Sequence, residues 1–478
     1  MSLRTIGFWL GALIFVLMLS LAPPVGMPLP GWRTAAVTAL MAVWWFTEAI
    51  PVALTGSLPF LLLPLLGVKR GDEVASNYMS PVIFLVIGSA MLGLALEKWG
   101  LHRRLALMVL RRSAVTPAAL LFSVMAVTAF ASMWINNSAA TVMMLPIAGA
   151  VLAASTRTMG ERGIPSDEAE RRYACAMALG VAWASNIGGL GTLIGTPVNI
   201  VAAAAIEKAL HVRVGFTDWL VFGVPIVIVA LPVGWWLLRV TVMRVSPPEP
   251  RRADVMSALG TLAPVSVPEW RTLCVLLATC TGWIAVPWLE KKLPGFSDAS
   301  VAILAFLLLC LLPSGNESGE KLLAWKDTGR APWYLILLLG GGIALADSVT
   351  GSGLAAWVGV AMRGFASQPV WLLLPLIALA LILVTECASN VATAATFIPL
   401  VAGLAVGGGH DAVLFCIVAG VAASWGFANP AGTSSNAMAF ATGTVRMPEM
   451  VRSGLWFDLV GALLLAGVCA AFVPLAMG

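Results

Sequence analysis

This sequence carries very little charge. Only 11% of its 478 residues are Asp, Glu, Lys or Arg, whereas soluble domains carry roughly a quarter. Hydrophobic residues make up 60% of the chain, and the mean hydropathy is +0.94. A chain with so little polar surface cannot fold as a soluble globular domain, so the composition predicts an integral membrane protein.

Histidine and cysteine are also scarce. The three histidines, His102, His211 and His410, all fall at expected loop positions. No Cys-x-x-Cys pair occurs, and most cysteines stand inside apolar runs, at positions 175, 274, 280, 310, 387, 416 and 469. We therefore expect buried free thiols and no disulfide framework or metal-ligating cluster. An intramembrane enzyme would need a nucleophile, base or metal centre, which these residues do not supply.

The apolar runs are long enough for helices. They reach ~17–25 residues, which suits a helix crossing ~30 Å of hydrocarbon, whereas barrel strands are ~10 residues with alternating polarity. The sequence thus predicts an all-α polytopic membrane protein of about 11 transmembrane helices. The expected spans are 7–24, 33–50, 52–68, 79–97, 175–202, 217–239, 270–288, 298–314, 332–350, 411–440 and 453–476. We interpret the first as a membrane helix and not a signal peptide, because no convincing cleavage site precedes Pro23-Pro24.

Two further apolar blocks, 116–155 and 370–407, are too long for one span, and each contains a polar break. Basic residues flank the first block on both sides, at Lys98, His102, Arg103, Arg104, Arg111, Arg112, Arg157, Arg162, Arg171 and Arg172. By the positive-inside rule both flanks are cytoplasmic, so the block is expected to enter the membrane and turn back as a helical hairpin.

The longest polar linker divides the chain into two halves. It lies within 239–271, is rich in arginine and proline, and is expected to be cytoplasmic and to resist helix formation. Counting spans from it places the ends of the second hairpin on the outer side. The prediction is therefore one membrane domain, 1–478, with inverted repeats at 33–241 and 270–476 joined by a linker at 242–269. The N-terminus is expected in the cytoplasm and the C-terminus outside.

The two polar breaks are Asn136-Asn137-Ser138 and Ser389-Asn390-Val391. Hydrocarbon cannot hydrogen-bond an exposed backbone, so such breaks survive only where they line a cavity or pack against protein. Helix N-termini there offer N–H groups to anions, and unwound carbonyl groups attract cations. Side chains that merely hold helices together are the alternative, but two related breaks indicate the midplane binding site of a secondary transporter.

A Gly/Pro-interrupted helix follows each hairpin. Both interruptions contain Gly-Thr-x-x-Asn, at 195–199 and 432–436, with Pro197 and Pro430 close by. Glycine and proline disturb the helical hydrogen-bond ladder and expose carbonyl groups. An ordinary kink is the alternative, but the motif recurs at the same place in both halves.

With these motifs the sequence resembles the divalent anion/sodium symporter family, the sodium-coupled carriers of dicarboxylates, citrate and sulfate. The matching segments keep the family order and cover nearly the whole chain. They are WWFTEAIPVALTGSLPFLLLPLLGV (44–68), LEKWGLHRRLAL (96–107), SMWINNSAATVMMLPIA (132–148), IGGLGTLIGTPVN (187–199), LLLGGGIALA (337–346), TECASNVATAATFIPL (385–400) and SWGFANPAGTSSNAMAF (424–440).

The resemblance implies a homodimer whose protomers each have a scaffold region and a mobile region that moves substrate by an elevator mechanism. It implies one sodium site at Ser132, Asn136, Asn137 and Gly195, and a second at Thr385, Ala388, Ser389, Asn390 and Gly432. It implies substrate contacts from Asn137, Ser138, Thr196, Ser389, Asn390, Val391 and Thr433.

Four positions, in three of the motifs, depart from the family pattern. Asn136 stands where serine is frequent, which bears on the first cation site. Val391 lacks the hydroxyl group of the fully polar motif and removes one possible hydrogen bond to substrate. Ser434 and Ser435 replace expected prolines within 428–436, which bears on the choice of anion.

Two carboxylates, Glu48 and Glu386, lie near apolar spans. Intramembrane carboxylates are costly and are usually functional or paired. Proton coupling is one interpretation. Pairing with a loop arginine or with a helix N-terminus is the other, and we favour it.

The function predicted from the sequence is import of a divalent anion, most simply a C4-dicarboxylate such as succinate or malate, driven by sodium across the cell (inner) membrane. Two cations would neutralise the dianion before it crosses a low-dielectric path. Alternatives within the class are a sodium-independent dicarboxylate exchanger and a sulfate or citrate carrier. A channel is disfavoured because opposed hairpins suit alternating access. The expected partners are the small anion, sodium ions, the lipid bilayer and a second copy of the chain. No organic cofactor and no nucleic acid are expected. The net charge of +5 is interpreted as a signal that orients the chain in the membrane.

Overall fold

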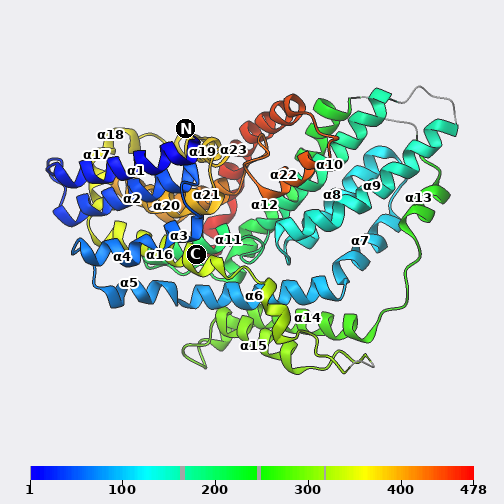
Figure 1. The fold of residues 1–478 in the computed structure, drawn as a ribbon, viewed down its shortest axis with the longest axis horizontal. Coiled ribbons are helices and arrows are strands. Elements are labelled where there is room, and N and C mark those ends of the chain that lie inside the picture. The colour runs from blue at the N-terminus through cyan, green and yellow to red at the C-terminus, as the bar shows by residue number, and fades with distance from the viewer. Residues whose placement is uncertain (1, 162–166, 245–248, 317–318, 478) are drawn as a thin grey trace.

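The computed structural model describes residues 2–161, 167–244, 249–316 and 319–477, and these residues form helices joined by loops (Figure 1). Within these ranges, the only β-structure is an isolated antiparallel bridge between Pro313 and Lys321. The prediction of an all-α protein is therefore confirmed. In chain order the helices are α1 (Leu3–Ser20), α2 (Leu29–Thr47), α3 (Val52–Gly56), α4 (Leu58–Leu65), α5 (Gly71–Tyr78), α6 (Pro81–Lys98), α7 (Leu101–Arg112), α8 (Pro117–Ser132), α9 (Asn137–Glu161), α10 (Asp167–Gly189), α11 (Pro197–Leu210), α12 (Phe216–Leu238), η1 (Arg239–Met243), α13 (Arg252–Leu259), α14 (Val267–Leu289), α15 (Asp298–Leu311), η2 (Trp325–Arg330), α16 (Tyr334–Gly351), α17 (Leu354–Ala361), α18 (Arg363–Ala366), α19 (Val370–Thr385), α20 (Asn390–Gly408), α21 (Ala412–Ala423), α22 (Ser434–Ala441) and α23 (Met447–Met477).

Long apolar helices dominate the molecule. Eight helical segments among the described residues are long and apolar enough to cross a membrane, and five shorter apolar segments accompany them. Several helices begin with proline directly after a Ser or Thr, as α6, α8 and α11 do. Proline fits the first helical turn because its missing N–H would have no intrahelical partner there.

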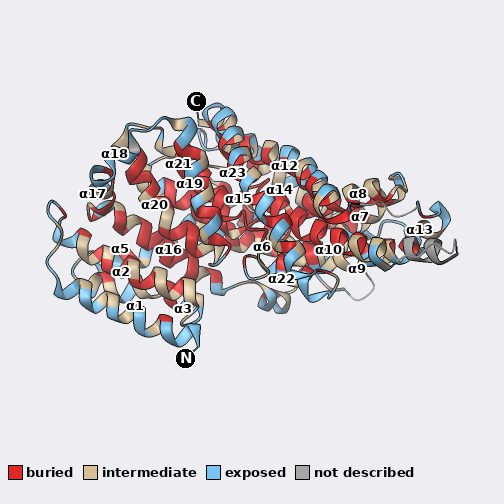
Figure 2. Ribbon diagram, turned by 90° about the horizontal axis from the view of Figure 1, so that it is seen from above, coloured by how far each residue is buried: buried red, intermediate tan, exposed pale blue. Residues whose placement is uncertain are grey.

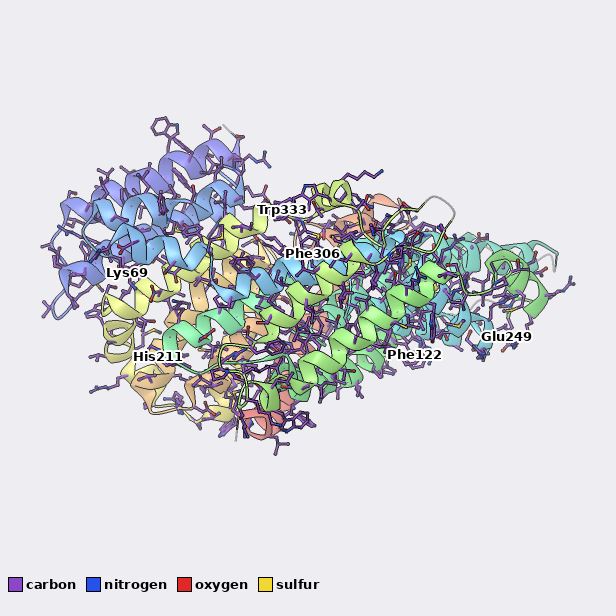
Figure 3. All side chains as sticks on the ribbon, turned by 90° about the horizontal axis from the view of Figure 1, so that it is seen from below. Lys69, Phe122, His211, Glu249, Phe306 and Trp333 are labelled. Atoms are coloured by element: carbon purple, nitrogen blue, oxygen red, sulfur yellow. The ribbon has the colours of Figure 1, made fainter. Side chains whose placement is uncertain are left out.

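The helices are arranged along one long axis (Figure 1). Helices α1–α5 gather with α16–α18 at one end, and α7, α8, α9 and α13 lie at the other. Helices α11, α12 and α21–α23 lie between these groups, α10 runs from the second group toward them beside α8 and α9, and α14 and α15 run beside α6. Figure 3 shows Lys69 and Glu249 near opposite ends of this axis. The two interrupted helices thus occupy the middle of the molecule.

Among the candidate spans, burial is greatest in α16 and α20. In α16 and α20, 67% of the apolar window is buried, compared with 11% in α1 (Figure 2). Small residues allow α16 to approach its neighbours closely. A Cβ atom on Gly341 would lie 1.9 Å from the carbonyl oxygen of Gly56 in α3, so only glycine fits there.

Most predicted spans appear as helices, but three are divided. The expected span 52–68 is split into α3 and α4, and the spans 175–202 and 411–440 are interrupted at residues 190–196 and 424–433. The blocks 116–155 and 370–407 each form two helices joined by four residues, α8 with α9 and α19 with α20. The polar breaks lie at these two turns, as predicted.

Two expectations were wrong in part. The linker was expected to resist helix formation, yet α13 forms within it, because the proline-rich stretch ends at Pro250 and the following RADVMSAL has no proline. The thiols were expected to be buried, but only Cys175, Cys416 and Cys469 are; sequence patterns do not show which side of an apolar helix faces outward. Linker residues 245–248 and Arg162 of the basic flank lie outside the described residues.

Candidate substrate and cation site

The first hairpin turn is organised by Asn137, the first residue of α9. Ser132, the last residue of α8, donates a hydrogen bond from its Oγ to Asn137 Oδ1 at 2.8 Å. The amide oxygen of Asn136 accepts from the backbone N–H of Ser138 at 2.8 Å, which satisfies one helix-end donor. Asparagine and serine side chains therefore close a turn that apolar residues could not.

The interruption between α10 and α11 is held by Asn199. Its Nδ2 donates to the carbonyl oxygens of Gly189 and Thr192, each at 2.8 Å. Thr192 in turn donates from Oγ1 to the carbonyl of Met133 in the hairpin turn, at 2.6 Å. A Cβ atom on Gly195 would lie 2.5 Å from the carbonyl oxygen of Gly189, so the loop needs glycine there.

The second half repeats this arrangement. Thr385, at the end of α19, donates to Asn390 Oδ1 at 2.8 Å, as Ser132 does to Asn137. Asn436 Nδ2 donates to the carbonyls of Gly426 and Asn429 at 3.1 Å each. These acceptors precede Asn436 by the same spacing that separates Gly189 and Thr192 from Asn199. Asn429 also donates to the backbone carbonyl of Glu386, as Thr192 does to Met133.

Hydrogen bonds also join the two halves. Asn186 of α10 lies between them: its Oδ1 accepts from Asn137 at 3.5 Å, and its Nδ2 donates to Thr433 Oγ1 at 2.9 Å. The hydroxyl groups of Ser138 and Ser434 are 2.6 Å apart. The start of α9 therefore contacts the start of α22 directly, and Asn137 reaches Thr433 through Asn186.

Ser185 and Asn186 were missed as site residues. Ser185 Oγ donates to the carbonyl of Asn137 at 2.8 Å and lies 3.1 Å from Ser435 Oγ. The available signal was a polar Ser-Asn pair within the apolar C-terminal part of α10, shortly before the Gly-rich interruption. The substituted residues Ser434 and Ser435 thus take part in the contacts between the halves.

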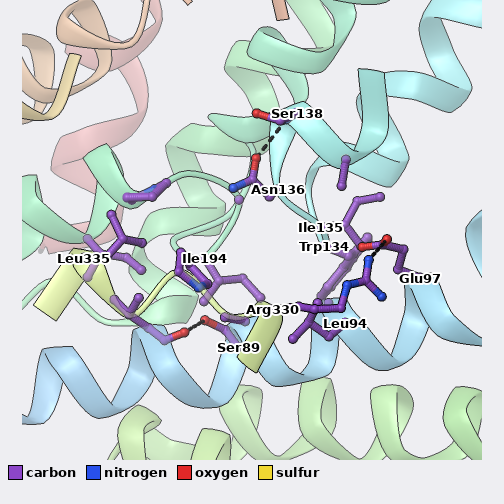
Figure 4. Close-up of a pocket in the computed structure, with 18 residues that line it drawn as sticks. Ser89, Leu94, Glu97, Trp134, Ile135, Asn136, Ser138, Ile194, Arg330 and Leu335 are labelled. Carbon is purple, nitrogen blue, oxygen red and sulfur yellow. Dashed lines mark hydrogen bonds and ion pairs between the residues drawn. The ribbon is translucent and has the colours of Figure 1, made fainter. Parts of the chain in front are cut away.

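A cavity of about 250 Å³ lies below the first hairpin turn (Figure 4). Asn136, Ser138 and Gly195 are the predicted site residues that line it. The remaining walls come from α6, α11 and the segment before α16. The predicted residues of the second half do not line this cavity; they are Thr385, Ala388, Ser389, Asn390, Val391, Gly432 and Thr433.

The remaining predicted residues are more enclosed. Thr196 is buried, and Asn137 is half-buried. Val391 is half-buried and packs against the hydrophobic core. The structure therefore links the two predicted halves of the site through Asn186 and the serine hydroxyl groups, and not through one shared cavity.

Glu386 organises the loop of the second half. It is buried, and its Oε1 accepts from the backbone N–H groups of Phe427 and, at 2.8 Å, Ala428. The carboxyl group of Asp458, also buried, lies beside it. Glu48 instead forms a 3.0 Å ion pair with Arg4 on an exposed face. Glu48 is thus paired with an arginine, but Arg4 belongs to α1 and not to a loop as expected. Glu386 binds loop N–H groups and not a helix N-terminus.

Aromatic rings surround the same loop. Phe427 packs against Trp183, with 5.5 Å between ring centroids, and against Phe457 at 4.7 Å. Trp425 Nε1 donates to the carbonyl of Phe457 at 3.3 Å. We call Trp183, Trp425, Phe427 and Phe457 the aromatic cluster; all four side chains are fully buried. It fixes the position of the backbone to which Glu386 binds.

Two buried amide oxygens could serve a cation. Asn199 Oδ1 and Asn436 Oδ1 have no hydrogen-bond donor among the described residues, although both side chains are fully buried. Unsatisfied buried acceptors are costly, and hard cations prefer oxygen ligands. The residues present are therefore compatible with sodium, with one such oxygen next to each interruption.

The chain resembles known transporters along its full length. A family model described as the sodium:sulfate symporter transmembrane region matches residues 5–477. The sodium-dependent dicarboxylate transporter SdcS of Staphylococcus saprophyticus is 33% identical, over 99% of this chain and 92% of that protein. SdcS of Staphylococcus aureus strain USA300 is 31% identical over the same shares.

A solved structure shows a similar fold. The YdaH transporter of Alcanivorax borkumensis aligns with a TM-score of 0.58, covering 94% of this chain and 99% of that one, at 15% identity. At that identity the likeness concerns the fold alone.

The family match also settles the broad class. The protein is an integral membrane transporter and not an enzyme, as the scarcity of histidine and the scattered cysteines predict. The family match spans both hairpins and both interrupted helices whose geometry is described above. The chain therefore belongs to the sodium:sulfate symporter family, the divalent anion/sodium symporters that its motifs resemble.

Proposed function

We propose that this protein imports a C4-dicarboxylate, such as succinate or malate, together with sodium ions. The observation that carries the proposal is the matched pair of hairpin turns, each closed by a hydroxyl–asparagine hydrogen bond. Asn186 joins the first turn to Thr433, in the interruption that follows the second hairpin. The named function of the SdcS relatives, sodium-dependent dicarboxylate transport, supports it.

The network that joins the first hairpin to Thr433 and Ser434 contains neutral amides and hydroxyl groups, and its hydrogen bonds involve no basic side chain. Such groups can bind carboxylates, but they do not neutralise them. Moving a bare dianion into a low-dielectric environment would cost a large Coulomb and desolvation energy. Co-transported sodium ions would remove that cost, so coupling follows from the chemistry of the site.

The proposed sodium sites follow the two turns. The first uses oxygen atoms of Ser132, Asn136, Asn137 and the Gly195 backbone, and the second those of Thr385, Ala388, Ser389, Asn390 and the Gly432 backbone. The unsatisfied oxygens of Asn199 and Asn436 lie on the same interruptions and support this placement. The substrate carboxylates would contact Asn137, Ser138, Thr196, Ser389, Asn390, Val391 and Thr433.

The proposed transport cycle is of the elevator type, in a homodimer. Residues 33–241 and 270–476 would be inverted repeats, with the N-terminus in the cytoplasm and the C-terminus outside. The repeated spacing around Asn199 and Asn436 supports the internal repeat. The cluster of basic residues around α7 supports a cytoplasmic position for that helix.

The test is uptake of radiolabelled succinate into proteoliposomes with and without an inward sodium gradient. We expect uptake to require the gradient. Uptake that does not depend on sodium but is stimulated by internal dicarboxylate would instead identify an exchanger. Selective uptake of sulfate or citrate would show that the proposed substrate is wrong.

Site variants test the assignment of residues. Asn137→Ala and Asn390→Ala should each abolish uptake while the protein still folds, because each removes the amide that closes a hairpin turn. Asn316→Ala, in an exposed loop, is the matched control and should transport normally. Normal uptake by both site variants would show that the assignment is wrong.

A further inference from the structure

The cavity below the first hairpin turn has one charged wall. Its lining includes the hydroxyl group of Ser89 and the side chains of Asn136 and Ser138. Among the residues that line it, Arg330 is the only basic one and Glu97 the only acidic one. Figure 4 shows Arg330 across the cavity from Asn136 and Ser138, with its guanidinium group paired to Glu97.

The position of Arg330 comes from its local structure. It is the last residue of η2 and is followed by Ala331-Pro332, which ends the helical turn before α16. Glu97 comes from α6, one residue before that helix ends. Neither residue belongs to a hairpin, so the pair forms a wall that faces the hairpin turn but is separate from it.

Neighbouring ion pairs differ from this one. Arg104 binds both carboxylate oxygens of Glu269, and its side chain is only 15% exposed. Lys98 binds Asp327 at 2.9 Å, outside the cavity lining, and is 21% exposed. The Arg330 side chain is 60% exposed, and solvent-exposed ion pairs contribute little to stability. Glu97 can therefore be displaced from Arg330 at low cost, whereas the other two pairs hold helices together.

The geometry points to a further role: we propose that Arg330 receives one carboxylate of the transported anion inside this cavity, displacing Glu97. Guanidinium offers five N–H donors in a planar fork that matches a carboxylate. While the cavity holds no anion, Glu97 keeps the wall neutral; once a dianion is present, the two carboxylates compete for Arg330. The inference rests on the proposed anion transport and adds a specificity residue outside the hairpins.

Substitutions of the two residues of the pair should then change the affinity for the anion in opposite directions. Arg330→Gln should weaken succinate binding about tenfold, the usual loss for one charge-assisted interaction. Glu97→Gln should strengthen binding about twofold to threefold, because it removes the competing carboxylate. Arg330→Lys keeps the charge but loses the fork, and should lie between the wild type and Arg330→Gln.

The experiment is a thermal-shift titration of the full-length protein in detergent, with succinate, malate, citrate and sulfate, at fixed sodium. Arg70→Gln is the control, since Arg70 forms an even more exposed ion pair with Asp72 away from the cavity. The control should bind like the wild type.

Several outcomes would overturn the proposal. One is unchanged binding in Arg330→Gln. Another is equal weakening in Arg330→Gln and Glu97→Gln with recovery in the charge-exchanged double variant, which would show that the pair only ties α6 to η2. If sulfate or citrate stabilises the wild type and succinate does not, the proposed substrate fails, and the same variants test Arg330 with that anion.

Discussion

The two hairpin turns share one framework but differ in what surrounds it. In each, a hydroxyl group at the end of one helix binds the asparagine that begins the next, and an asparagine further along binds two loop carbonyls. Around the first turn lies a cavity with an exposed Asn136. Around the second lie a buried Glu386, Asp458 and the aromatic cluster.

The difference begins with the length of the interruption. Residues 190–196 separate α10 from α11, whereas the longer stretch 424–433 separates α21 from α22. In the first half, the N–H groups of Leu190 and Gly191 bond back to helical carbonyls. In the second half the helix ends earlier, so Phe427 and Ala428 need another acceptor, and Glu386 supplies it. Met133 takes the position of Glu386 in the first half. A shorter helix thus explains a costly buried carboxylate.

The strongest test of the shared framework compares two single variants, in which Asn199 or Asn436 is replaced by alanine. Alanine at either position loses two hydrogen bonds to loop carbonyls and one candidate cation oxygen. We expect each variant to lose about tenfold to a hundredfold in apparent sodium affinity, from about 1 kcal/mol for each hydrogen bond. The measurement is the sodium dependence of thermal stability in detergent. If one variant behaves like the wild type, the two halves are not functionally equivalent.

A second test concerns Glu386, the residue by which the two turns differ. Glu386→Ala should strongly destabilise the protein, because two buried N–H groups lose their acceptor at a cost of about 1–3 kcal/mol each. Glu386→Gln keeps an acceptor oxygen and should retain most of the stability. Met133→Ala, at the matching position, should cost about 1 kcal/mol, since Met133 is only half-buried.

Thermal unfolding followed by loss of the monodisperse chromatographic peak compares these three variants. Similar melting temperatures for Glu386→Ala and Met133→Ala would contradict the proposed role of the carboxylate in the loop.

The smallest effect is expected where the halves meet. Ser138→Ala or Ser434→Ala removes one hydroxyl of a partly exposed pair, worth about 0.5–1.5 kcal/mol. We expect the KM for succinate to rise about twofold to tenfold in either variant. The double variant should be no worse than the single variants, because both remove the same contact. Additive effects in this double-mutant cycle would show that the two hydroxyl groups act independently.

The sequence predicts the two hairpin turns and the two interrupted helices better than it predicts the contacts around them. Helix-breaking residues and polar tripeptides mark both turns, because hydrocarbon tolerates such residues only at protein-lined sites. The all-α class, the two hairpins and both interruptions could therefore be predicted from local chemistry.

Contacts between segments could not be predicted in the same way. Asn186 meets Thr433, and Glu386 meets Asp458, across 247 and 72 residues of sequence respectively. Apolar helices lack a polar face that would show which side meets a neighbour. The cavity beside the first turn, and the place of Arg330 in its lining, likewise depend on how the helices pack.

The aromatic cluster has an optical consequence. Two of its members, Trp183 and Trp425, are fully buried indoles whose rings contact Phe427, the residue bonded to Glu386. Indole emission shifts in wavelength with the polarity around the ring, so any rearrangement of residues 424–433 will change the fluorescence spectrum. The difference spectrum between the wild type and Trp425→Phe isolates that signal from the other tryptophans. The second half of the molecule thus carries its own reporter, and Trp134, which lies in the first turn, provides one for that turn.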